Sequence, residues 1–129
     1  MRALLDTHIL LWALATPDRL PDGLRRHIAD KRNEILFSAA SIWDIAVKSG
    51  LGRADFQADP RLVPDTATAS GFVELPVTAS AALLVASLPP LHKDPFDRLL
   101  VAQALSEPAV LFTADSRLTG YAPDLIRRA

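Results

Sequence analysis

The chain has no cysteine among its 129 residues. This absence excludes disulfide scaffolds, thiolate zinc sites, iron–sulfur clusters and cysteine nucleophiles. No run approaches the roughly 18 apolar residues that a membrane span requires. The apolar opening, residues 1–15, is interrupted by Arg2, Asp6 and His8, and no small-residue cleavage pattern follows it. We therefore expect a cytoplasmic protein with no membrane partner.

Neither sign of charge dominates, and glutamate is scarce. The 14 Lys and Arg residues face 15 Asp and Glu residues, so the basic surface typical of nucleic-acid binders is missing. The acids are 12 aspartates and three glutamates. Aspartate is favoured at helix caps, turns and hard-metal sites, so each one has to be assigned to one of these roles. A hydrophobic share of 50% favours an oligomeric or partner surface.

Short apolar segments alternate with helical ones along the chain. The length suits one domain over residues 1–129. Strands are expected at residues 3–5, 35–37, 72–75 and 110–112, with a short fifth candidate at 125–126. Helices are expected at residues 9–15, 21–32, 38–48, 65–70, 79–88 and 96–105, and an irregular stretch at 53–64. This order predicts a three-layer α/β domain, with helices on both faces of a parallel sheet.

Two aspartates directly follow predicted strands. Asp6 comes after the first strand and Asp115 closely follows the fourth. In open α/β sheets the ligand crevice lies beyond the carboxyl ends of the strands, so both acids are candidates for a site there. Each also has a local alternative, because Asp6 can cap the next helix and Asp115 can cap a single helical turn.

Two further aspartates lie in helical segments. Asp44 is the only charge in the apolar stretch 39–47, where a carboxylate is costly unless it is paired or binds a cation. Its alternative is an ion pair with Lys48, four residues on. Asp97 follows Asp94 by three residues, a spacing that also resembles a capping box.

These four aspartates form a stronger pattern together than singly. Carboxylates that share a crevice repel one another and need a cation. Oxygen ligands select a hard divalent ion, Mg²⁺ or Mn²⁺. Such an ion suits phosphoryl chemistry, because it can orient the scissile phosphate, activate a water and stabilise the departing oxyanion.

Five segments in order resemble the PIN-domain ribonucleases, most closely the VapC toxins of bacterial toxin–antitoxin pairs. They are residues 4–8 (LLDTH), 38–48 (SAASIWDIAVK), 50–52 (GLG), 92–104 (HKDPFDRLLVAQA) and 111–115 (LFTAD). The resemblance implies a single PIN domain with a five-stranded parallel sheet and an acidic Mg²⁺ pocket. It also implies cleavage of RNA, inhibition of translation, silencing by a cognate antitoxin, and a homodimer.

The resemblance assigns roles by position. Asp6 and Asp97 match the principal metal ligands, and Asp115 matches a further acid of the pocket. Asp44 matches the family's helix acid, so the implied catalytic set is Asp6, Asp44, Asp97 and Asp115. Thr113 and Asp94 are expected to line the pocket.

Two departures from the family keep alternatives open. Most relatives have Glu where this chain has Asp44, whose side chain reaches about 1.5 Å less, so a bridging water is expected there. Many relatives also carry another acid soon after Asp115, whereas residues 116–122 contain none. A catalytically silent antitoxin-binding module is the main alternative. A phosphotransfer domain with Asp6 as nucleophile is disfavoured, because no second acid follows two residues later.

Other residue types add less to the site. The spacing of His8, His27 and His92 does not suggest a metal site. Lys48 and Arg98 are the basic residues nearest the acids, and we expect them to contact RNA.

Overall fold

The computed structural model describes residues 1–52 and 58–129 and contains one five-stranded sheet. Each strand is parallel to its neighbours, in the order β3-β2-β1-β4-β5. The strands are β1 (Arg2–Leu5), β2 (Glu34–Ser38), β3 (Val73–Leu75), β4 (Val110–Thr113) and β5 (Ile126–Arg128). The predicted parallel α/β fold is confirmed.

Six α-helices and three short 3-10 helices connect the strands in the described part of the chain. The α-helices are α1 (Thr7–Ala15), α2 (Asp22–Ala29), α3 (Ala39–Gly50), α4 (Val63–Ala69), α5 (Ala79–Leu84) and α6 (Pro95–Ser106). The 3-10 helices are η1 (Pro17–Arg19), η2 (Val85–Ser87) and η3 (Ser116–Tyr121). None of the helices in these ranges is long and apolar enough to cross a membrane.

Most predicted elements are present, with shifts at their ends. The helix expected at 21–32 stops at Ala29, because Asp30 leaves the helical conformation and its side chain accepts the backbone N–H of Arg32. The helix expected at 79–88 tightens into η2 after Leu84. Of the irregular stretch expected at 53–64, residues 53–57 lie outside the described residues, and α4 already begins at Val63.

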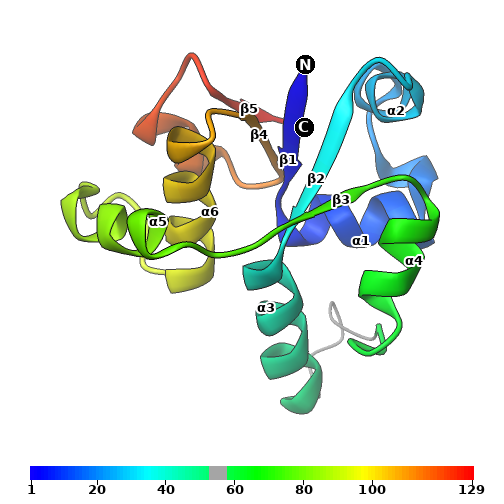
Figure 1. Ribbon diagram of the computed structural model, residues 1–129, viewed down its shortest axis with the longest axis horizontal. Helices are drawn as coiled ribbons and strands as arrows, with labels where there is room; N and C mark the ends of the chain where they lie inside the picture. The colour runs from blue at the N-terminus through cyan, green and yellow to red at the C-terminus, as the bar shows by residue number, and fades with distance from the viewer. Residues whose placement is uncertain (53–57) are drawn as a thin grey trace.

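Successive strand residues point to opposite faces of the sheet, and both faces are covered. Leu4 and Leu36 pack into one cluster, with Leu100 of α6. Leu5 and Phe37 pack into the other cluster, which includes residues of α1, α2 and α4. Figure 1 shows α1, α2 and α4 on one side of the sheet and α5 and α6 on the other. This double coverage explains why the inner strands β1, β2 and β4 are mostly apolar, whereas the edge strands β3 and β5 include charged residues.

The sheet has its topological switch point at β1. The chain moves outward from β1 through β2 to β3 on one side, and from β4 to β5 on the other. A crevice forms at the carboxyl ends of strands where the order reverses in this way. Asp6 directly follows β1 and Asp115 lies two residues after β4, so the fold brings both to this crevice.

Candidate metal centre

A pocket of about 510 Å³ opens at the carboxyl edge of the sheet. Its walls carry five of the six predicted site residues, all of them aspartates. The lining residues are Asp6, His8, Trp12, Asp44, Lys48, His92, Asp94, Asp97, Ala114, Asp115, Ser116, Arg117 and Arg128. Acids from two strand ends and two helices therefore meet in one cavity.

Asp6 is held by neutral donors in a buried position and is only 4% exposed. Its Oδ1 atom accepts the backbone N–H of Ile9 at 2.9 Å, so the capping role that the sequence left open is present. Its Oδ2 atom accepts the Thr113 hydroxyl at 2.6 Å and the N–H of Ala114 at 2.9 Å. Burial raises the pKa of Asp6, and these hydrogen bonds offset only part of that rise.

Thr113 lies behind Asp6 rather than on the pocket wall that the sequence suggested for it. It is fully buried at the end of β4. Its hydroxyl donates to Asp6 and accepts the backbone N–H of Asp115 at 3.0 Å. Thr113 therefore links the segments that follow β1 and β4, and it orients Asp6 from the protein interior.

Asp97 is a second pocket acid whose ionised form is disfavoured. It lies in the first turn of α6, and its side chain is 21% exposed. Burial raises its pKa to about 7, and the nearby charges of Asp94, Asp6 and Asp44 add to the rise. A carboxyl group that stays protonated up to this pH has too little positive charge nearby. A bound cation would supply that charge and stabilise the ionised form.

Asp115 is already paired with a cation. Arg117 donates from Nη2 to Oδ2 at 2.8 Å and from its backbone N–H to Oδ1 at 2.9 Å. This guanidinium holds the pKa of Asp115 well below its usual range. Asp115 also caps η3, so its local alternative is present as well.

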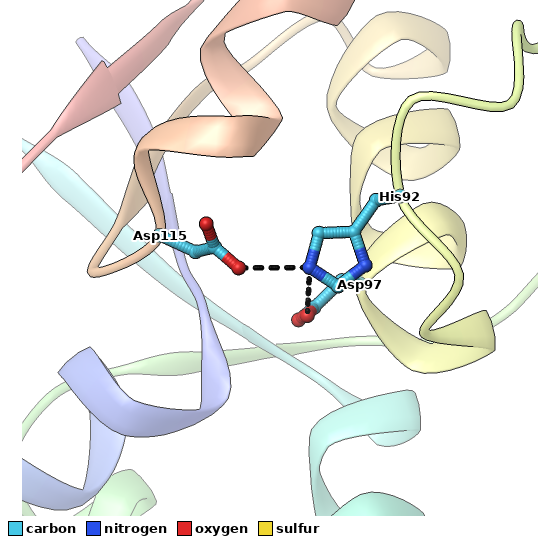
Figure 2. A group of neighbouring side chains, drawn as sticks. All are labelled: His92, Asp97 and Asp115. Carbon is cyan, nitrogen blue, oxygen red and sulfur yellow. Dashed lines mark hydrogen bonds and ion pairs between the residues drawn. The ribbon is translucent and has the colours of Figure 1, made fainter.

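His92 is a site residue that the sequence did not reveal. Its Nδ1 atom accepts the backbone N–H of Asp94 at 2.9 Å, so the proton of the neutral ring lies on Nε2. That Nε2 atom is 2.8 Å from Oδ2 of Asp115 and 3.6 Å from Oδ2 of Asp97 (Figure 2). Although these three residues lie close enough together to hold a metal, His92 is placed as a donor that orients carboxylates.

Asp44 has the lysine partner that the sequence offered as its alternative. Lys48 Nζ lies 2.8 Å from Asp44 Oδ1 and 3.2 Å from Asp94 Oδ2. Burial lowers the pKa of Lys48, but the two carboxylates outweigh it, and the net shift is upward. Asp94 also caps α6 by accepting the N–H groups of Phe96 and Asp97.

Arg98, which was expected to contact RNA, makes its hydrogen bonds within the fold and does not line the pocket. Its guanidinium donates to the carbonyl oxygens of Val85, Leu88 and Pro89 and to the hydroxyl of Tyr121, at 3.1 to 3.3 Å. These bonds fasten the loop before α6, because a guanidinium can serve several acceptors at once. The basic side chains that line the pocket are Lys48, Arg117 and Arg128.

Fold and pocket together define a parallel α/β domain whose acidic donor set suits a hard divalent cation. The family model described as PIN domain matches residues 3–122. The chain therefore belongs to the PIN domain family.

Solved structures share this fold along nearly the whole chain. A chain of VapBC2 from Rickettsia felis, bound to a promoter DNA fragment, aligns with a TM-score of 0.73 at 18% identity. Chains of DNA-bound VapBC from Salmonella typhimurium and of VapBC-1 from nontypeable Haemophilus influenzae give TM-scores of 0.69 and 0.68, at 14% and 16% identity. In each case the match covers 99% of this chain and 98% of the other. No curated protein sequence gives a significant match.

Proposed function

We propose that this protein is a metal-dependent endoribonuclease and the toxin of a toxin–antitoxin pair. The observation that carries the proposal is the position of Asp97. Its carboxyl group lies in a pocket with four other aspartates, and its pKa is raised to about 7. Such a group is stabilised by a divalent cation, and hydrolysis of a phosphodiester bond is the chemistry that this ligand type serves.

The donor set fits Mg²⁺, with Mn²⁺ as a substitute, because the pocket offers several carboxylate oxygens. Asp6, Asp97 and Asp115 are the residues that would hold the ion. It would supply a Lewis acid for the scissile phosphate and an activated water for its hydrolysis. Thr113 and His92 keep the ligand carboxylates oriented.

Two basic residues of the pocket wall would contact the RNA backbone. Arg117 is 68% exposed at its side chain, and with Arg128 it adds positive charge to the pocket wall. Because the net charge is −1, long-range attraction of RNA is small and local contacts must supply the affinity. Binding should therefore neutralise only a few phosphates and depend modestly on salt.

The proposed partners are a cognate antitoxin and a second copy of the chain, in the cytoplasm. The likeness to chains of VapBC assemblies supports the antitoxin. Exposed apolar side chains support both partners, since Trp43 is 60% and Leu51 is 72% exposed.

Incubation of the purified chain with RNA in Mg²⁺, in Mn²⁺ and in EDTA tests the proposal. We expect internal cleavage with either metal and none with EDTA. Intact RNA under all three conditions, from a folded protein, contradicts the enzyme assignment.

A catalytically silent antitoxin-binding module remains the second candidate. The observation that favours it is the internal pairing of two pocket acids, Asp44 with Lys48 and Asp115 with Arg117. This candidate predicts a stable complex with the antitoxin and no cleavage at any metal concentration.

A further inference from the structure

Lys48 reaches into the acidic pocket as a nearly buried cation. It projects from α3, and its side chain is 15% exposed. Its ammonium lies between Asp44 at 2.8 Å and Asp94 at 3.2 Å. The ammonium is also 5.7 Å from the centre of the Phe96 ring, a further favourable contact for a cation. Lys48 is therefore fixed by contacts from both α3 and α6.

The acids of the pocket differ in the positive charge beside them. Lys48 supplies an ammonium to Asp44 and Asp94, and Arg117 supplies a guanidinium to Asp115. Asp6 is held by the neutral donors Thr113, Ile9 and Ala114. Asp97 lies 3.6 Å from the ring nitrogen of His92. Among the described residues no lysine or arginine forms an ion pair with Asp6 or Asp97, so a divalent cation gains most beside these two carboxylates.

We propose that Lys48 is a built-in cation that takes the place of a second divalent ion, so that the pocket binds one ion, beside Asp6 and Asp97. This inference rests on the proposed function, because it concerns the ion of that same site. A second ion near Asp44 would have to displace the ammonium or tolerate its repulsion. Lys48 is thus a positioning residue that directs the ion away from Asp44 and Asp94 and toward Asp6 and Asp97.

The short side chain of Asp44 agrees with this role. An aspartate keeps its carboxylate close to α3, one helical turn from Lys48, where the ion pair forms. A glutamate at this position would reach about 1.5 Å farther.

Counting bound Mn²⁺ by electron paramagnetic resonance on the full chain tests the inference. We expect one ion per wild-type chain and one for Lys48→Arg, which keeps the charge. Lys48→Met should bind two ions, the second at least tenfold more tightly than any second ion in the wild type. Lys48→Gln is the alternative if the methionine variant does not fold. Asp6→Asn is the control for the ion itself and should lower its affinity at least tenfold.

The outcomes separate this inference from the function on which it rests. Two ions in the wild-type chain overturn the role of Lys48 and leave the metal-dependent nuclease intact. A count that stays at one in a folded Lys48→Met or Lys48→Gln variant also overturns it. No bound ion in the wild type overturns both the inference and the proposed function.

Discussion

The Nε2 atom of His92 lies 2.8 Å from Oδ2 of Asp115, across 23 residues of chain. The backbone N–H of Asp94 fixes the proton of the neutral ring on that nitrogen by donating to Nδ1. The imidazole, 6% exposed, therefore acts as a rigid donor to a pocket carboxylate. An oriented ligand loses less freedom when it binds a metal, so His92 should strengthen metal binding without touching the ion.

Replacing His92 by alanine should weaken binding of Mn²⁺ by about 10-fold or more, because residues that support metal ligands typically contribute 10- to 100-fold. The lost hydrogen bonds should also lower the free energy of unfolding by about 1–2 kcal/mol. Lys93→Ala, at the exposed neighbouring position, is the matched control and should change neither quantity. Unchanged Mn²⁺ affinity in a folded His92→Ala protein would remove His92 from the site.

The raised pKa of Asp97 makes stability depend on pH when no metal is present. Its folded pKa is about 7 against an ordinary value of 3.8, so the folded state binds the proton more tightly than the unfolded state. This contribution is fully present below about pH 4 and is lost as pH rises through 7. In EDTA, the free energy of unfolding should therefore contain a component that falls between pH 4 and 7.

Urea unfolding at half-unit steps of pH measures this component. Asp97→Asn lacks the titrating group and should show a flatter profile across the same interval. Mg²⁺ should counteract the fall, because the ion binds the ionised carboxylate of the folded state. Asp115 acts in the opposite direction and at lower pH, since its lowered pKa adds stability that is lost only on acidification. Identical profiles for wild type and Asp97→Asn would contradict the electrostatic account.

Asp44→Ala should destabilise the protein by about 1–3 kcal/mol, because it removes one of the two carboxylates that hold the buried ammonium of Lys48. Asp44→Asn keeps the shape of the side chain and a weaker hydrogen-bond acceptor, so it should lower the free energy of unfolding by less than Asp44→Ala does. Chemical denaturation in EDTA compares the two variants. A stability equal to wild type for Asp44→Ala would show that the ion pair with Lys48 contributes nothing to the fold.

The sequence predicted the sheet because β1, β2 and β4 are short, mostly apolar runs bounded by turns and helix caps. It placed Asp6 and Asp115 in the pocket for a related reason, since residues just after parallel strands meet at one edge. Asp97 followed from its place in the first turn of a capped helix together with the family resemblance.

The course of the loop before α6, and the distant partners of its side chains and of Lys48, could not be predicted from the sequence. His92 contacts Asp115 from the loop before α6, and Arg98 donates hydrogen bonds to backbone carbonyl oxygens that precede this histidine. The sequence showed Lys48 to be near Asp44, but it could not show that Asp94 shares the same ammonium from 46 residues away. Such contacts depend on tertiary packing, which leaves no periodic signal in the chain.

The rate of Mg²⁺-dependent RNA cleavage by Asp97→Asn tests the central claim most directly. This variant suits the test better than Asp6→Asn, because Asp6 also caps α1 and accepts two further hydrogen bonds, from Thr113 and Ala114. Asp65→Asn, on the exposed side of α4, is the control that should cleave at the wild-type rate. The account predicts that Asp97→Asn folds and loses about 100-fold or more of the cleavage rate, since the ion loses a ligand charge. Cleavage by Asp97→Asn at the wild-type rate would contradict it.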